Sequence, residues 1–261
     1  MYEYEIKKLV LCKLLSLEDN DSIFLNEFAV DLVRADIAIF NGNIHLIEIK
    51  SPRDSLQRLE KQLNYFSLYS EKCTLVIHAK HYKKAIKTVP KFIGLWIVKN
   101  EEIIVDRLAK KRNIEAIFLS EFWWSQELKL LLGRVLPKAS KLPVEALRKA
   151  FIELVSYDKI CKWTKENLKI KFHKRSLKVI EAVKKNIPFP KWEMPDINKK
   201  YLLKLRQRLL QDGVQKKASS LTWDCRERRW RYRQFSLVHH NQHTLHHEQN
   251  LLQKALTEQL L

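Results

Sequence analysis

Residues 34–66, RADIAIFNGNIHLIEIKSPRDSLQRLEKQLNYF, decide the fold of this chain. Two short runs rich in isoleucine, 34–40 and 44–50, flank the triplet Asn41-Gly42-Asn43, which is typical of a β-hairpin turn. A Ser-Pro pair ends the second run, and apolar residues then recur at helical spacing through residues 53–70. The stretch therefore predicts a β-hairpin followed by a helix.

The segments around this hairpin extend the same alternation of strands and helices. A helix is expected over residues 2–17, and a strand over 23–30 precedes the hairpin. After the hairpin and its helix we expect a strand at 73–79, a second hairpin over 94–105 and a helix over 120–135. This order predicts an α/β fold with a mixed sheet flanked by helices.

Strand signals disappear from Leu142 onward, and helical spacing takes over. Prolines separate the last two of these segments. The expected helical segments are 143–155, 157–168, 174–186 and 198–212. We therefore place a domain boundary near 137–143, and expect an α/β domain at 1–137, a basic all-helical domain at 142–213 and a C-terminal segment at 214–261.

Charge is divided unevenly along the chain, which has 261 residues and a formal net charge of +19. Residues 1–135 carry a net charge of +3, whereas residues 136–235 hold 27 basic and 10 acidic side chains, a net charge of +17. A basic helical module beside a nearly neutral domain is typical of proteins that contact phosphate backbones. The alternative is a merely solvated surface. An anionic membrane is disfavoured because the basic residues form no compact cluster.

Composition limits the class of protein. Hydrophobic residues make up 46 % of the chain, which is enough for a sizeable core. No apolar run of about 18 residues predicts a transmembrane helix, and the N-terminus lacks the features of a signal peptide. The four cysteines form no CxxC pair. We therefore expect a cytoplasmic protein with free thiols, no cysteine zinc site and no membrane partner.

Three charged side chains, Asp36, Glu48 and Lys50, interrupt the apolar strands of the hairpin. Glu48 and Lys50 are at i and i+2, so they share one face of their strand. Hydrolysis of a phosphodiester requires a divalent cation, oxygen ligands that hold it and a positioned water, which two carboxylates and a lysine can supply. The alternative is an ordinary amphipathic strand with these side chains in solvent.

The length of the hairpin loop decides whether the two carboxylates meet. A three-residue loop with a positive φ inside it pairs Phe40 with Ile44 and carries Asp36 opposite Glu48. A two-residue loop sends the two carboxylates to opposite faces of the sheet. The metal-site hypothesis therefore requires the three-residue loop, or another register of the same parity.

The stretch resembles the PD-(D/E)XK, or restriction-endonuclease-like, superfamily, whose core contains a strand aspartate, a hairpin, an E-x-K motif and a helix. More narrowly, it is similar to a bacterial family of uncharacterised PD-(D/E)XK-like proteins. The resemblance covers about residues 20–180 and is most specific at 34–65. The matching residues are Arg34 and Asp36, Gly42, Glu48 to Ser51, Asp54 to Leu59, Gln62 and Tyr65.

This resemblance implies a restriction-endonuclease-like sheet and a catalytic centre. Asp36 and Glu48, together with the carbonyl of Ile49, would bind Mg²⁺ or Mn²⁺. Lys50 would orient the attacking water and stabilise the charge on the phosphate. Glu27 matches an acidic position that precedes the hairpin in such enzymes, with a plain surface glutamate as the alternative.

The helix after the hairpin would contribute two further residues. Gln62 would face the catalytic centre, as a helical glutamine often does in this superfamily. Arg58 lies one turn earlier on the same helix and would contact the nucleic acid.

The expected function is therefore that of a divalent-metal-dependent nuclease, endo- or exonuclease, acting on DNA or on RNA through a water held by the cation and oriented by Lys50. A homodimer or a partner protein would complete the unit. The alternative is a non-catalytic nucleic-acid-binding or adaptor protein that retains the fold. DNA repair, a mobile element or phage defence would be the biological setting.

Two stretches near the C-terminus carry separate signals. Residues 223–235 interleave aromatic residues with arginines, which suits phosphate contacts and base stacking; a segment that docks its aromatics on the core is the alternative. The arginines are Arg226, Arg228, Arg229, Arg231 and Arg233. Residues 239–247 hold five histidines, which would bind zinc if they share a helix face and otherwise form a polar surface or tail.

Overall fold

A six-stranded mixed sheet lies at the centre of the computed structural model, which describes residues 2–30, 33–219, 221–224 and 229–232. Its strands follow chain order, with antiparallel pairs at both ends and parallel pairs from β3 to β5. The strands are β1 (Ile23–Val30), β2 (Val33–Phe40), β3 (Ile44–Lys50), β4 (Lys72–His78), β5 (Gly94–Lys99) and β6 (Glu102–Arg107). The expectation of a mixed α/β sheet is confirmed.

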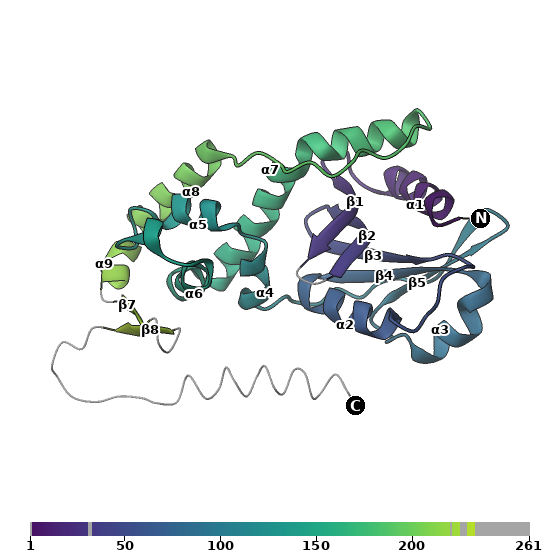
Figure 1. Ribbon diagram of the computed structural model, residues 1–261, viewed down its shortest axis with the longest axis horizontal. Helices are drawn as coiled ribbons and strands as arrows, with labels where there is room; N and C mark the ends of the chain where they lie inside the picture. The colour runs from purple at the N-terminus through teal and green to yellow at the C-terminus, as the bar shows by residue number, and fades with distance from the viewer. Residues whose placement is uncertain (1, 31–32, 220, 225–228, 233–261) are drawn as a thin grey trace.

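Helices cover both faces of this sheet (Figure 1). Helix α1 (Glu3–Leu17) lies on one face, and α2 (Leu59–Tyr69) and α3 (Tyr82–Thr88) lie on the other. Because side chains alternate along a strand, the two faces build two separate core clusters. One contains Ile37, Ile39 and Ile47 beneath α1, and the other contains Ala38 and Leu46 beneath α2.

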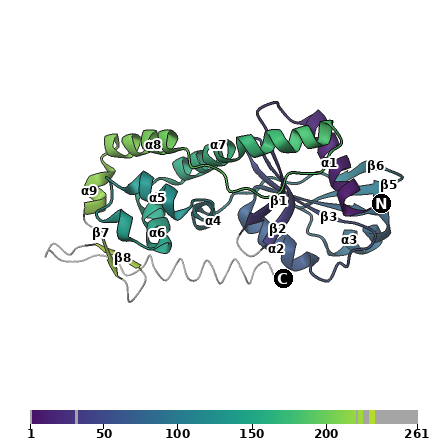
Figure 2. The same cartoon turned by 45° about the horizontal axis from the view of Figure 1, so that its top comes forward.

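The second half of the chain is largely helical, and one long helix joins it to the sheet. Helix α7 (Tyr157–Lys184) leaves the helical group and runs across β1, as both ribbon views show (Figures 1 and 2). The other elements are α4 (Ala116–Glu121), α5 (Ser125–Leu132), α6 (Val144–Leu154), α8 (Lys199–Gln211), α9 (Val214–Ser219), two 3₁₀ turns (Ala79–His81 and Ala139–Lys141) and the pair β7 (Leu221–Asp224) and β8 (Arg229–Tyr232). A single core cluster extends from Ile23 in β1 to Leu221 in β7.

Several expected elements were wrong in their extent. The helix expected over 53–70 begins only at Leu59, because Asp54 accepts a hydrogen bond from the Ser51 N–H and holds a turn there. The helix expected over 120–135 is split into α4 and α5, where Glu127 accepts from the Trp124 N–H and starts a new helix.

The C-terminal part also differs from its prediction. The helices expected over 157–168 and 174–186 are one helix, α7. The elements described within 142–213 are helices, and β7 and β8 form an antiparallel pair in the C-terminal segment expected at 214–261. Helices α3 and α9 were not predicted. None of the described helices combines the length and the apolar character that a membrane crossing requires.

Candidate metal centre

The β2–β3 hairpin has the register that the metal-site hypothesis requires. Phe40 pairs with Ile44 across a three-residue loop, and Gly42 in that loop has a φ of +96°. The paired ladder runs as far as Ile37 and Ile47 and then ends. At that end Oδ2 of Asp36 accepts a hydrogen bond of 2.7 Å from the N–H of Ile49. The carboxylate thus replaces the next backbone acceptor, and the three-residue loop is confirmed.

Glu48 is almost fully buried, with 3 % of its surface exposed. Its Oε1 accepts a hydrogen bond of 2.6 Å from Nζ of Lys50, whereas its Oε2 has no hydrogen-bond partner among the described residues. Burial raises the pKa of the Glu48 carboxyl, and Lys50 and then Gln62 counteract this only in part. A buried, unpartnered carboxylate oxygen is costly unless a cation or a proton meets it.

Asp36 lies between Glu48 and a second group of charges. Its Oδ1 is 3.5 Å from Nζ of Lys7, a residue of α1. Burial, and then the charge of Glu48, raise the pKa of Asp36 to about 7, although Lys7 and the Ile49 N–H oppose the shift. A carboxyl whose pKa is raised by burial and by a neighbouring carboxylate is typical of functional sites.

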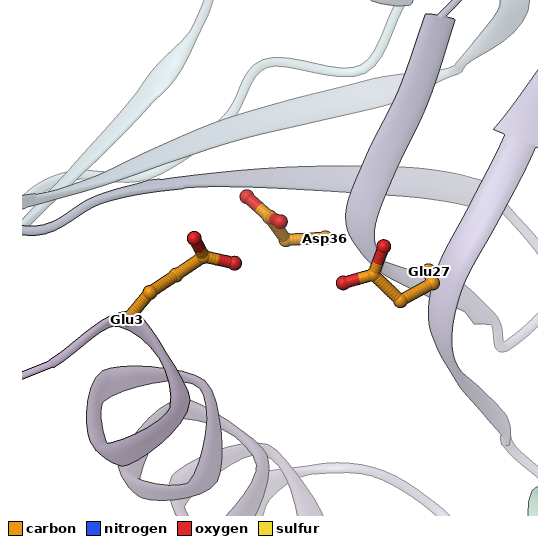
Figure 3. A group of neighbouring side chains, drawn as sticks. All are labelled: Glu3, Glu27 and Asp36. Atoms are coloured by element: carbon orange, nitrogen blue, oxygen red, sulfur yellow. The ribbon is translucent and has the colours of Figure 1, made fainter. Parts of the chain in front are cut away.

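The carboxylates of Glu3 and Glu27 converge on Asp36 (Figure 3). Oxygens of Glu3 from α1, Glu27 from β1 and Asp36 from β2 all lie within 4.8 Å of one another. Glu27 has a φ of +56°, which a non-glycine residue rarely adopts. After it the strand changes phase: Leu25 and Phe28, three positions apart, belong to the same core cluster. The irregularity aims Glu27 at α1.

The ammonium of Lys7 sits among these three carboxylates. It is 3.4 Å from Glu3 Oε1 and 3.5 Å from Asp36 Oδ1, and it donates a hydrogen bond to Glu27. Burial by itself lowers the pKa of Lys7, but Asp36, Glu27 and Glu3 more than offset this, so the pKa is raised. A positive charge is thus already favoured where the carboxylates meet.

These residues fit a divalent cation. Carboxylate oxygens are the ligands that Mg²⁺ and Mn²⁺ prefer, and both Asp36 and Glu48 are held by the hairpin rather than by loops. Oε2 of Glu48, which accepts no hydrogen bond from the described residues, provides a ligand atom. Ile49 is buried beside them and its N–H is bonded to Asp36.

The other expected site residues are placed less uniformly. Gln62 interacts with Glu48, and its own Oε1 is buried without a partner among the described residues. Arg58, at the start of α2, is exposed one turn before Gln62. Arg229 and Arg231 belong to strand β8. Arg226, Arg228, Arg233 and the histidines at 239–247 lie outside the described residues.

The sequence did not reveal Glu3 and Lys7. They are four residues apart on α1, which makes them look like an ordinary surface ion pair. The one sequence feature that indicated a buried Lys7 is its position directly after Ile6, beside the apolar stripe of the helix. The structure shows that both residues are buried. Their partners are 20 or more positions away, and no local periodicity encodes that contact.

Comparisons with known proteins place the chain in a family. A family model described as Bacteriophage P4 protein cII matches residues 1–191. Protein cII of Enterobacteria phage P4 is 40 % identical over 78 residues, a stretch that spans 29 % of this chain and 30 % of that protein. A solved structure, the SPO1766 protein of unknown function from Silicibacter pomeroyi, aligns with a TM-score of 0.36 at 17 % identity over 44 % of this chain and 76 % of that one. Because the family model spans well over half of the 261 residues, the chain belongs to the Bacteriophage P4 protein cII family.

Proposed function

We propose that the protein is a divalent-metal-dependent nuclease with a restriction-endonuclease-like fold and a catalytic centre of Asp36, Glu48 and Lys50. The observation that carries the proposal is the buried Glu48 carboxylate, whose Oε2 has no partner among the described residues while Lys50 binds its Oε1 at 2.6 Å. Asp36 approaches it across the end of the hairpin. Such strongly perturbed carboxylates beside a lysine are typical of catalytic sites.

The order of elements supports the same proposal. Helix α1, three antiparallel strands, helix α2 and the parallel strand β4 follow one another in the arrangement expected for the superfamily. The charged pair lies at the end of the hairpin, next to α2, as that arrangement requires. A shared fold does not by itself fix the chemistry, which depends on the site residues.

Each residue has a defined task in this proposal. Asp36 and Glu48 would hold Mg²⁺ or Mn²⁺, which when bound supplies a Lewis acid that neutralises charge on the phosphate. Lys50 would place its ammonium beside the attacking water and the charge that develops on the phosphate oxygens. Gln62 would orient Glu48. Glu27 would help position Asp36, because the Lys7 ammonium contacts both carboxylates.

The proposed substrate is DNA, with RNA as the related possibility. The net charge of +17 over residues 136–235 supplies the phosphate contacts, including those from the arginines of 223–235. The proposed setting is the cytoplasm, where the free thiols of Cys12, Cys73 and Cys161 stay reduced. The phage protein that names the family supports a phage or other mobile-element context. A homodimer or a partner protein would allow both strands to be cut.

The test is cleavage of plasmid and single-stranded DNA with Mg²⁺ or Mn²⁺ against EDTA. We expect wild-type cleavage that requires the metal, and its loss by at least about a hundredfold in Lys50→Ala, because the positioned ammonium is removed. Lys99→Ala, which changes an exposed lysine of the same sheet, is the matched control and should cleave normally. Metal-dependent cleavage that survives Lys50→Ala would disprove the assigned centre.

One observation favours a second candidate, a nucleic-acid-binding protein that keeps the fold without the chemistry. The Lys7 ammonium already contacts Glu3, Glu27 and Asp36, so part of the negative charge of these three carboxylates is balanced without a metal. Tight DNA binding by the wild type, with no cleavage on any substrate and no calorimetric heat of Mg²⁺ or Mn²⁺ binding, would favour this candidate.

A further inference from the structure

An aromatic cavity of about 400 Å³ lies where β1 meets the helical part of the chain. Its walls come from β1, the end of α2, the α4–α5 junction, α6, α7 and the segment before α8. Figure 2 shows α7 passing from the helical part to the edge of the sheet at β1. Six aromatic residues line it: Phe28, Tyr69, Phe122, Trp124, Phe172 and Trp192. Its size is in the range of small-molecule sites, about 300–1,000 Å³.

Cations stand against the aromatic walls. The guanidinium carbon of Arg175 is 4.2 Å from the centre of the Trp192 ring, and Nζ of Lys171 is 4.2 Å from the centre of the Trp124 ring. Lys171 is paired with the buried Glu127 at 2.8 Å, so its charge is compensated. Arg175 forms no such ion pair with the described residues, although the charges of Glu193 and Glu27 act on it.

Arg175 has spare hydrogen-bonding capacity in a buried place. Only 7 % of the residue is exposed, and its Nη2 donates to the carbonyl of Asn26 at 2.8 Å. Its Nε and Nη1 are buried and have no partner among the described residues. Nε of Arg148, a residue of the cavity wall, is likewise buried and unpartnered. Unmet donors on an arginine are suited to an anion, and phosphate matches the guanidinium fork.

The cavity adjoins the acidic centre through strand β1. Asn26, which holds Arg175, and Phe28, which lines the cavity, flank Glu27 of the acidic group. The cavity wall and the acidic group therefore share strand β1 and are built from consecutive residues of it.

We propose that this cavity receives an unpaired nucleobase of a nucleic-acid strand, with the guanidinium of Arg175 on a phosphate of that strand. The inference rests on the proposed nuclease function and specifies its substrate as single-stranded or locally unpaired nucleic acid. Aromatic rings stack on any base, whereas a base inside a duplex must first be unstacked at a cost of a few kcal/mol. The half-exposed Trp192 ring is the entry wall, since 52 % of that residue is accessible.

A free nucleotide carries the same chemistry, a base with a phosphate, and the charge of the surrounding segment favours a strand. Helix α7, which supplies Phe172 and Arg175, belongs to the segment with a net charge of +17, which suits a ligand with many phosphates.

The test uses an oligonucleotide with a single 2-aminopurine flanked by thymines, in EDTA so that nothing is cleaved. Binding is followed by anisotropy of an end label, and stacking of the base by quenching of the 2-aminopurine emission. Trp192→Ala removes the entry wall, Trp192→Phe retains a ring, and Met194→Ala changes an exposed apolar residue of the same segment that does not line the cavity. Melting temperatures confirm that each variant is folded.

We expect wild type, Trp192→Phe and Met194→Ala to bind the single strand and quench its emission. Trp192→Ala should bind about tenfold more weakly and lose most of the quenching, because stacking of one base is removed. A blunt duplex should bind more weakly than the single strand to the wild type. The proposal is overturned if duplex and single strand bind equally, if Trp192→Ala quenches normally, or if a deoxynucleoside monophosphate binds as tightly as the strand. Because the readout needs no cleavage, a failed nuclease assay and a failed cavity give different results.

Discussion

The charge arrangement around Lys7 shows how a single side chain can set the state of a site. Only 5 % of the surface of Lys7 is exposed, and its ammonium contacts carboxylates from α1, β1 and β2. Three carboxylates within 4.8 Å of one another would otherwise repel strongly in a partly buried place. Lys7 and a divalent cation are therefore alternative solutions to the same electrostatic problem.

Lys7→Met should expose this competition. In EDTA we expect the variant to lose about 2 kcal/mol of unfolding free energy, since a buried pair has lost one partner. Millimolar Mg²⁺ should then stabilise Lys7→Met more than the wild type, because the cation replaces the missing charge. Urea unfolding with and without Mg²⁺ measures both effects. Lys8→Met, whose ammonium bonds to Asn186 and lies over the Tyr4 ring but touches none of the three carboxylates, is the control and should show neither. An unchanged stability of Lys7→Met on adding Mg²⁺ would exclude a cation site at these carboxylates.

Among the helices and strands, the sequence predicted features set by residues close together in the chain. It missed contacts between residues far apart in the chain. The hairpin register followed from loop length and alternation as far as the Ile37–Ile47 pair, beyond which Asp36 bonds the N–H of Ile49. Helix limits were less predictable, because Asp54 forms a local turn that competes with the helix. Lys7 could not be predicted as a site residue, because its partners Glu27 and Asp36 become neighbours only when α1 packs on the sheet.

Strand β3 also carries a buried histidine that should make stability depend on pH. Nε2 of His45 lies 2.8 Å from Oγ1 of Thr74 on β4. Burial, and then the charge of Lys72, lower the pKa of His45 to about 3. Below its unfolded pKa of about 6.5, the unfolded chain binds a proton that the folded chain refuses, so stability falls as pH drops, by up to about 1.4 kcal/mol per pH unit.

His45→Gln should remove this dependence while keeping a polar group beside Thr74. The measurement is the unfolding free energy in urea at pH 7, 6, 5 and 4.5 for both proteins. The raised pKa of Asp36 acts in the opposite direction and is common to both, so the difference between them isolates His45. Equal pH slopes for wild type and His45→Gln would show that the folded protein protonates this histidine freely.

Helix α7 joins the helical part of the chain to the mixed sheet, because it packs against both. Its Leu168 and Phe172 belong to the core cluster shared with α4–α6, and its Val179 and Val183 belong to the cluster beneath α1. Lys171 lies between the two buried stretches of α7. In the sequence this lysine suggests a solvent-exposed break, but in the structure it is paired with Glu127. This is why two helices were predicted, and why the boundary placed near 137–143 is not a gap in the packing.

The uneven charge of the molecule should make its binding to nucleic acid depend strongly on salt concentration. If the basic part neutralises about six phosphates, a plot of log affinity against log salt concentration should have a slope near about −5. Lys200→Glu with Lys204→Glu, on the exposed side of α8, should make that slope shallower by about 2. Lys83→Glu with Lys87→Glu makes the same charge change on α3, in the nearly neutral half, and should leave the slope unchanged. Anisotropy titrations of single-stranded DNA in EDTA between 50 and about 300 mM salt give all three slopes. A wild-type slope near zero, or equal effects of the two double variants, would show that the helical part does not supply the phosphate contacts. The acidic centre would then have to bind its substrate without the helical part.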